Sequence, residues 1–283
     1  MTAEFDIDET VAGVATFFDG IGMAEWDRHD ENAAARVAFE LHRRMLRRHV
    51  RSGARVLEVG AGPGRFTLEL AALQASVTVA DISEVQLRLN EQTVRDAGVA
   101  EAVRAWVRCD IRDLSRFTPG EFDAVVAYGG PISYTFEDAE QVTAGLLGLL
   151  PPGGVFLASL MSLLGAWRMY APHLVSQVAA GALTFDDIDV VLRTADTRHD
   201  PSVRHKCRCF RADEVAAMVH AGGGEVLELS ASGWAAFQAP ESVASLLDDP
   251  ARREWFLDWE ERFSASPGAL DGGAHILVAA RRA

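Results

Sequence analysis

The sequence lacks the features that mark membrane, secreted or zinc-binding proteins. Among its 283 residues, no apolar run approaches the roughly 18 residues that a membrane span needs. The acidic start, MTAEFDIDET, has neither the basic region nor the apolar core of a signal peptide. The three cysteines fit no disulfide framework and no zinc pattern. We therefore expect a cytoplasmic protein that does not enter a membrane and holds no metal.

Basic residues are also scarce, with 27 Lys and Arg against 41 Asp and Glu, for a net charge of −14. Contacts to nucleic-acid phosphates are electrostatic, so this sign argues against a DNA or RNA partner. One local exception is the segment RRMLRRHVR, which contains five arginines: Arg43, Arg44, Arg47, Arg48 and Arg51. Helical spacing favours a solvated helix face there, with an anion-binding patch as the alternative.

Short apolar runs alternate with helical segments from about residue 55 to 160, as in SVTVAD followed by SEVQLRLNEQTVRDAG. This alternation is typical of a parallel sheet with helices on both faces. We predict an α/β fold with a doubly wound, mostly parallel, Rossmann-like sheet of seven strands. The predicted parts are an N-terminal helical cap (1–50), a core (51–160), a lid and acceptor-binding insertion after the fifth strand (161–204), and a C-terminal completion of the core (205–283).

The stretch VLEVGAGPGRF joins a predicted strand to a predicted helix through glycines at alternate positions, Gly60, Gly62 and Gly64. A dinucleotide fingerprint would need a glycine where Arg65 stands, and a P-loop would need G-K-[ST], which does not follow. Glycines at a helix N-terminus allow a ligand to approach the backbone closely.

The motif EVGAGPG resembles the first motif of the class I S-adenosylmethionine-dependent methyltransferases, [DE]-x-G-x-G-x-G. Further segments match that family in the correct order: VTVAD, CDI, FDAVVAYGG and LLPPGGVFL. The pair Phe17-Phe18 is similar to the aromatic pair with which many small-molecule members begin. The resemblance implies S-adenosyl-L-methionine as cofactor. It implies cofactor binding by Phe18, Glu58, Gly60, Ala61, Gly62, Gly64, Asp81, Ile82, Asp110, Ile111, Ala127 and Tyr128.

Three acids carry most of the expected cofactor chemistry. The resemblance implies that Asp81 binds both ribose hydroxyls; a carboxylate meets a vicinal diol with two charge-assisted hydrogen bonds. A role as helix N-cap is the alternative, for which Ser83 competes. Glu58 lies in an apolar strand and needs a polar partner, and we expect that partner at the amino end of the cofactor. Asp110 is implied to lie near the adenine amino group, with an ordinary turn acid as the alternative.

The acceptor side carries fewer signals. AYGGPISY lacks the [DN]-P-P-[YF] tetrapeptide of many amino-methylating members, which shifts the expectation to a small metabolite. We expect the acceptor to contact Ser133, Trp167, Arg168 and Tyr170, and Tyr134 and His173 to orient or deprotonate its nucleophile. Packing within the lid is the alternative for Trp167 and Tyr170, and an ordinary histidine the alternative for His173. A site role for His205 is the less favoured of its two interpretations.

The sequence thus predicts methyl transfer to a small-molecule acceptor by in-line displacement. A lyase or cyclase that consumes S-adenosylmethionine on the same fold is the alternative, because both need the same pocket. A dehydrogenase is disfavoured by Arg65, and a non-catalytic binding protein by the complete series of motifs. A homodimer is left open.

Overall fold

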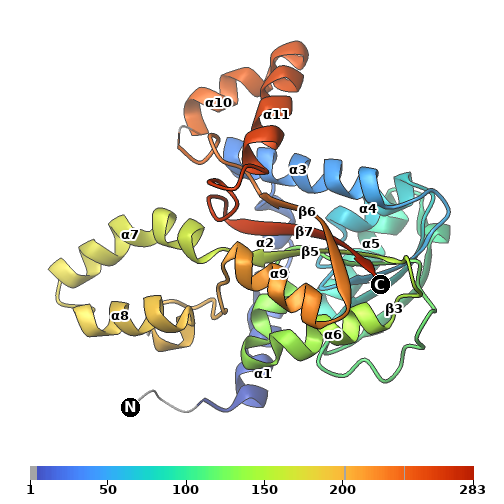
Figure 1. The fold of residues 1–283 in the computed structure, drawn as a ribbon, viewed down its shortest axis with the longest axis horizontal. Coiled ribbons are helices and arrows are strands. Elements are labelled where there is room, and N and C mark those ends of the chain that lie inside the picture. Colours follow the sequence, from blue (N-terminus) through green and yellow to red (C-terminus); the bar gives the residue numbers. More distant parts are fainter. Residues whose placement is uncertain (1–4, 201, 239) are drawn as a thin grey trace.

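A sheet of seven strands forms the centre of the molecule, in the order β3-β2-β1-β4-β5-β7-β6 (Figure 1). The computed structural model describes residues 5–200, 202–238 and 240–283. The strands are β1 (Arg55–Val59), β2 (Ser76–Asp81), β3 (Val103–Arg108), β4 (Ala124–Ala127), β5 (Val155–Met161), β6 (Gly224–Ala231) and β7 (His275–Arg282). The first five strands pair in parallel, and β7 runs antiparallel to β5 and β6. The predicted doubly wound, mostly parallel, seven-stranded sheet is confirmed.

Two layers of helices cover the sheet. Successive side chains of a strand point to opposite faces, and here both faces carry apolar residues that the helices bury. On β1, Val56 packs in the cluster that contains residues of α3, α4 and α5, whereas Leu57 packs in the cluster that contains residues of α6 and α9. These helices are α3 (Ala33–His49), α4 (Arg65–Ala72), α5 (Glu84–Asp96), α6 (Ala139–Gly148) and α9 (Ala212–Ala221). Short 3-10 helices lie in loops at η1 (Ala100–Ala102), η2 (Pro131–Tyr134), η3 (Phe136–Asp138) and η4 (Thr197–His199). Among the residues described, no helix has both the length and the hydropathy of a membrane span.

Two N-terminal helices, α1 (Ile7–Ile21) and α2 (Ala24–Asp27), lie over one end of the sheet. The side-chain amide of Gln86 at the start of α5 donates to the carbonyl of Phe18 at 2.8 Å. Arg112, in the loop after β3, donates to the Asp8 carboxylate at 2.8 Å. These contacts hold both ends of α1 over the carboxyl ends of β2 and β3. Residues 1–4 of the predicted cap lie outside the described part of the chain.

The insertion after β5 forms an arm of two helices, α7 (Leu163–Ala179) and α8 (Phe185–Thr194), that extends away from the sheet (Figure 1). Trp167 and Tyr170 on α7 are 41% and 58% exposed, so the alternative that they form a lid core is wrong. That this insertion closes over the acceptor stays a prediction.

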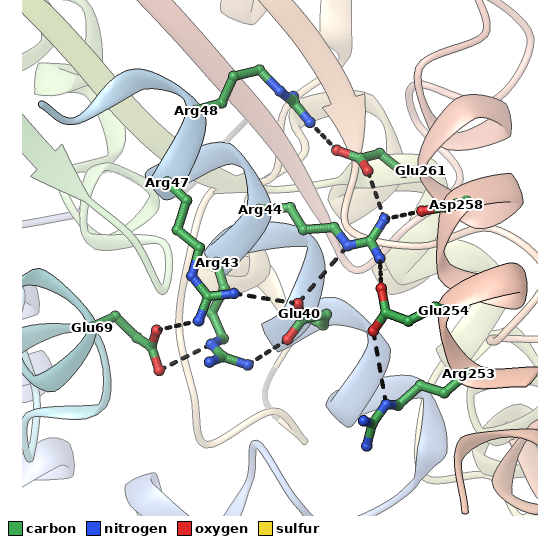
Figure 2. A network of polar contacts seen from close by, with 10 residues as sticks. All are labelled: Glu40, Arg43, Arg44, Arg47, Arg48, Glu69, Arg253, Glu254, Asp258 and Glu261. Atoms are coloured by element: carbon green, nitrogen blue, oxygen red, sulfur yellow. Dashed lines mark hydrogen bonds and ion pairs between the residues drawn. The ribbon is translucent and has the colours of Figure 1, made fainter. Parts of the chain in front are cut away.

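A further helical pair, α10 (Pro240–Leu247) and α11 (Pro250–Ser264), lies between β6 and β7 in sequence and packs on α3 (Figure 1). Figure 2 shows the ion pairs between these helices. Arg44 of α3 binds Glu254 at 2.8 Å, Asp258 at 2.7 Å and Glu261 at 3.0 Å, all on α11. On the neighbouring side, Arg43 and Arg47 bind Glu69 of α4 at 2.9 and 3.2 Å.

The arginine cluster fits the solvated-face interpretation only in part, because Arg47, Arg48 and Arg51 are exposed whereas Arg43 and Arg44 are not. The side chains of Arg43 and Arg44 are only 27% and 15% exposed, and their guanidinium groups face carboxylates of neighbouring helices. Helical periodicity showed where the charged face lies but gave no information on which acids of α4 and α11 would cover it.

Candidate active site

A cavity of about 830 Å³ lies at the carboxyl ends of β1 to β4, beneath α1 and α2. This is where the strand order changes direction between β1 and β4, the usual place for ligands in open α/β sheets. Residues from the ends of four strands line it: Gly60, Ala61, Gly62, Pro63, Arg65, Phe66, Asp81, Ile82, Cys109, Asp110, Ile111, Tyr128, Gly129, Pro131, Tyr134 and Thr135. The N-terminal segment supplies Val11, Val14, Phe18, Glu25, Arg28 and His29.

The glycine loop is shaped by contacts that a side chain would disturb. Gly60 has φ of +61°, and a Cβ there would stand 2.6 Å from Pro131 in the loop after β4. Gly62, with φ of +54°, donates its backbone N–H to the Asp81 carboxylate at 2.9 Å. The loop therefore leaves bare backbone at the cavity wall, as the sequence predicts.

Asp81 joins this loop to the end of β2. Its second carboxylate oxygen accepts from the N–H of Ser83 at 2.8 Å. Ser83 caps α5, accepting from the N–H of Gln86 at 3.0 Å, so Asp81 is not the N-cap. Burial raises the pKa of Asp81 to about 6, against backbone hydrogen bonds from Ser83, Gly62 and Ile82 that lower it. The carboxylate lines the cavity and is a strong acceptor for a ligand hydroxyl.

Glu58 does not line the cavity. Its carboxyl group accepts from the Thr67 hydroxyl at 2.7 Å, and Asn90 donates to Thr67 at 2.8 Å. Asn90 also donates to the carbonyl of Gly62 at 3.2 Å. Burial raises the pKa of Glu58 to about 8, so the group is largely protonated near neutral pH. In this structure Glu58 supports the glycine loop from below; contact with the cofactor's amino end stays a prediction.

Asp110 lines the cavity but is also bound by an arginine that the sequence reasoning missed. Arg112 contacts the Asp110 carboxylate at 2.7 and 2.9 Å and reaches Asp8 of α1 with its remaining nitrogen. Asp110 thus links the β3 loop to the helix that covers the cavity. The pattern D-I-R gave no signal for this arrangement, because the second partner of Arg112, Asp8, lies 104 residues away in sequence.

The wall opposite the glycine loop is aromatic. Tyr134 lies between Phe18 and His205, with ring centroids 5.4 and 5.0 Å apart respectively. Burial holds the pKa of Tyr134 well above its usual value. Its hydroxyl therefore keeps its proton near neutral pH and can donate a hydrogen bond, but is poorly suited to remove a proton. Tyr128 packs on Phe66 with centroids 5.0 Å apart.

Three predicted residues near the cavity do not line it. The Ser133 hydroxyl accepts from the backbone N–H of Met161 at 2.9 Å and so joins η2 to the end of β5. Gly64 begins α4 as its N-cap, with φ of +102°. Ala127 is fully buried at the end of β4. These residues shape the loops that carry the site.

The predicted acceptor residues on α7, namely Trp167, Arg168, Tyr170 and His173, also lie outside the cavity lining. The Arg168 guanidinium lies over the rings of Trp234 and Phe237, 5.7 and 5.4 Å from their centroids. It therefore connects the arm to the loop after β6. Roles of these four residues in acceptor binding stay predictions.

The site contains a charged pair that sequence reasoning missed. Arg28 and Glu25 form an ion pair of 2.5 Å on the cap side of the cavity. Arg28 Nη2 lies 3.2 Å from where a Cβ on Gly129 would stand, and Glu25 Cγ lies 3.7 Å from the same position on Gly62. Opposite charges thus stand beside the loops that follow β4 and β1. The segment AEWDRH is visibly charged, but nothing in its spacing shows that it faces these loops.

Residues 56–154 match the family model of a methyltransferase domain. The ubiquinone/menaquinone biosynthesis C-methyltransferase UbiE of Idiomarina loihiensis is 29% identical over 127 residues, which cover 42% of this chain and 49% of that protein. The enzyme of the same name from Yersinia enterocolitica is 29% identical over 138 residues, covering 46% and 53%. The chain thus spans about half the length of the curated relatives that it matches.

Solved structures share the fold over most of the chain. The 1,6-didemethyltoxoflavin-N1-methyltransferase of Burkholderia thailandensis, bound to 1,6-didemethyltoxoflavin and S-adenosylhomocysteine, superposes with a TM-score of 0.58 at 19% identity, covering 100% of this chain and 92% of that one. The [4+2]-cyclase SpnF gives 0.54 at 18% identity, covering 86% and 80%. Residues 56–154 are thus similar to a methyltransferase domain, and the whole chain shares its fold with S-adenosylmethionine-dependent methyltransferases of class I.

Proposed function

We propose that the protein transfers a methyl group from S-adenosylmethionine to a small-molecule acceptor. The observation that carries this proposal is the single cavity that combines the glycine loop, the Asp81 carboxylate and an aromatic wall under α1. The space above Gly62, which a side chain would enter, fits a ligand that lies against bare backbone.

The cavity residues divide into three groups by their chemistry. Asp81 accepts hydrogen bonds from the ribose hydroxyls, and Ile82 and Ile111 offer apolar contact to the adenine. The Glu25–Arg28 pair complements the ammonium and carboxylate groups of the methionyl end. When bound, S-adenosylmethionine supplies a methyl group already activated by a positively charged sulfur. Phe18 contacts the cofactor from α1, and Tyr134, which packs on Phe18, remains to contact the acceptor.

The remaining task of the protein is to hold the acceptor atom in line with that methyl group. Positioning of this kind supplies up to about 7–11 kcal/mol in well-oriented intramolecular reactions. Tyr134 orients the acceptor through its protonated hydroxyl, and no nucleophilic side chain is needed. The cap formed by α1 excludes water from the reacting atoms.

The position of the cavity beneath α1 and α2 supports a small acceptor, and the net charge of −14 argues against a nucleic-acid acceptor. The matched proteins differ in the atom that their names give as methylated, carbon in one and N1 in another. The atom methylated here is therefore a matter for experiment.

Calorimetry and product analysis test the proposal. We expect binding of S-adenosylmethionine and S-adenosylhomocysteine but not of NAD, and formation of S-adenosylhomocysteine when metabolite fractions are supplied. Binding of NAD without S-adenosylmethionine would contradict it. Release of methylthioadenosine would instead favour the lyase or cyclase alternative; the fold itself is shared with a [4+2]-cyclase.

A further inference from the structure

A second cavity, of about 660 Å³, lies between α1 and the segment that runs from η4 to Lys206. Val14 lines both cavities, so the two share a wall. In the second cavity, α1 supplies Phe17, and the other segment supplies Arg198, Arg204, His205 and Lys206. Nothing in the proposed cofactor site uses these residues.

The second cavity is basic in an acidic protein. Arg198, Arg204 and Lys206 line it, and the described lining residues include no carboxylate. Lys206 donates to the backbone carbonyls of Thr197 and Asp200. Burial lowers the pKa of Lys206, against the nearby Asp200 and Asp196 that raise it. Its ammonium group has backbone partners but, within the described ranges, no ion pair.

The two arginines differ in how far their charge is already matched. Arg198 pairs with Asp196 at 2.7 Å and Glu137 at 2.8 Å, yet its Nη1 is buried without a hydrogen-bond partner in the described chain. Arg204 is exposed and forms no ion pair with the residues described. Of the three cations that line this cavity, Arg204 alone has no carboxylate beside it within the described residues, and Arg198 retains one nitrogen without a partner there.

An aromatic layer separates this basic space from the first cavity. The His205 ring stacks on Phe17, with centroids 4.7 Å apart and planes 9° apart. On its other side it approaches Tyr134 at 5.0 Å and Phe18 at 5.7 Å. His205 Nε2 is buried and has no partner among the described residues. His205 therefore links the two sites, because it lines the basic cavity and its ring also contacts Tyr134 of the first cavity.

We propose that the basic cavity binds the phosphate or carboxylate group of the methyl acceptor, while the methylated part of that molecule lies beside Tyr134 in the first cavity. The inference rests on the proposed function, because it assigns an acceptor class to the same enzyme. Arginine and lysine bind such anions through charge-assisted hydrogen bonds, and the Phe17–His205 stack favours an acceptor with an apolar or planar part next to the anion.

Phenyl phosphate and benzoate are suitable probes, because each joins an anion to a ring. Calorimetry on the full chain should detect binding of both, and binding of inorganic phosphate that is at least about fivefold weaker. In the double variant Arg204→Gln/Lys206→Gln, affinity for phenyl phosphate should fall by about tenfold or more. The matched control Arg95→Gln/Arg193→Gln removes the same charge from two exposed helical ion pairs and should bind as the wild type does.

Several results would overturn the proposal. Absence of binding of either aromatic anion, or equal binding by the two double variants, would remove the basic cavity as a site. Inorganic phosphate binding as tightly as phenyl phosphate would indicate a separate free-anion site rather than the acceptor's end. Because Lys206 is partly buried, Arg204→Glu alone provides a second test, with an expected loss of about fivefold or more. S-adenosylhomocysteine binding, measured on the same samples, tests the proposed function independently and should be unchanged.

Discussion

At the scale of single residues, two buried carboxyl groups show how environment separates chemically similar side chains. Burial raises the pKa of both Glu58 and Asp81, to about 8 and about 6. Glu58 faces the Thr67 hydroxyl below the glycine loop, whereas Asp81 faces the cavity. Of the two, only Asp81 is placed to accept hydrogen bonds from a ligand in the cavity.

Removing the Asp81 carboxylate should weaken cofactor binding strongly. Asp81→Ala deletes two charge-assisted hydrogen bonds to the ribose, a loss of about 2–4 kcal/mol or about 30- to 1000-fold in affinity. The measurement is calorimetric titration with S-adenosylhomocysteine. Asp96→Ala removes an exposed acid at the end of α5 and serves as control. Wild-type affinity in folded Asp81→Ala would show that the ribose is bound elsewhere.

A branched side chain in the glycine loop should have a comparable effect for a steric reason. In Gly62→Val, the valine must adopt the φ of +54° that glycine has here, and its side chain enters the space beside Glu25. The strain of this φ costs about 1–2 kcal/mol, and the methyl groups occupy cavity volume. We expect a folded protein without measurable cofactor binding; circular dichroism and calorimetry check the two parts. Normal binding would place the cofactor away from this loop.

Cofactor affinity should also depend on pH through Asp81. Ribose hydroxyls donate to the ionised carboxylate, so binding needs the form that exists above the pKa of about 6. Affinity should therefore rise about tenfold from about pH 5 to about pH 7. In Asp81→Asn the affinity is lower, and its pH dependence over this window should be flat. A wild-type profile that is equally flat would contradict the assignment.

At the scale of secondary-structure elements, ion pairs add to the apolar contacts that connect helices. Arg112 joins α1 to the β3 loop, and Arg44 joins α3 to α11 (Figure 2). Exposed single ion pairs contribute little to stability, but a guanidinium shared by three carboxylates also prevents their mutual repulsion.

Replacing Arg44 should therefore cost more than replacing an arginine with one partner. Arg44→Met leaves Glu254, Asp258 and Glu261 together on α11, and we expect the free energy of unfolding to fall by about 1 kcal/mol or more. Denaturant titration measures it, and added salt should reduce the loss. Arg95→Met, which removes one exposed helical pair, should change stability by less than about 0.5 kcal/mol. Equal losses would show that the network adds nothing beyond its separate pairs.

At the scale of the whole molecule, the fold places four histidines, His29, His42, His205 and His275, near Arg28. Burial is the main cause that lowers their pKa values: to about 2 for His29, about 4 for His42 and His205, and well below the usual value for His275. The nearby Arg28 guanidinium lowers all of them further. The interior is therefore built to hold neutral imidazoles.

This arrangement predicts a loss of stability in acid. Unfolded histidines bind protons near pH 6.5, whereas His42 in the folded state does so only near about pH 4, so stability should fall as pH decreases through this window. Glu58 and Asp81 act in the opposite sense, because their raised pKa values favour the folded state as they become protonated. Four histidines outweigh two carboxyls, and the melting temperature should drop between about pH 7 and about pH 5.

The variant His42→Gln removes one of the four contributions. Its melting temperature should depend less steeply on pH. The corresponding change in unfolding free energy across the window should be smaller than in the wild type by on the order of 1–2 kcal/mol. The slope, rather than the absolute stability, is the readout, because the substitution also alters packing against Phe66 and Tyr128. An unchanged slope would mean that His42 is not kept neutral by the fold.

The cofactor side of the site was predictable because its residues follow strands in local order. Gly60, Asp81 and Asp110 each stand just after a strand, and parallel strands end at one edge of a sheet. A residue's position in such a motif therefore gives its place in the fold. Glu58 shows the limit of this reasoning. The motif gives the position of Glu58 on the strand but not whether its side chain reaches the cavity, and in the structure it does not line it.

The sequence by itself determined the sheet, its connections and the edge at which a ligand would bind, because these follow from the period of apolar residues and from glycine spacing. Only the tertiary structure decided what covers that edge: Arg28 beside Gly129, Arg112 between Asp8 and Asp110, and the basic cavity where α1 meets the chain near Lys206. Those contacts join segments more than 100 residues apart, and the arm of α7 and α8 points away from them. The side chains involved have no shared period or spacing, so their meeting depends on how whole helices pack.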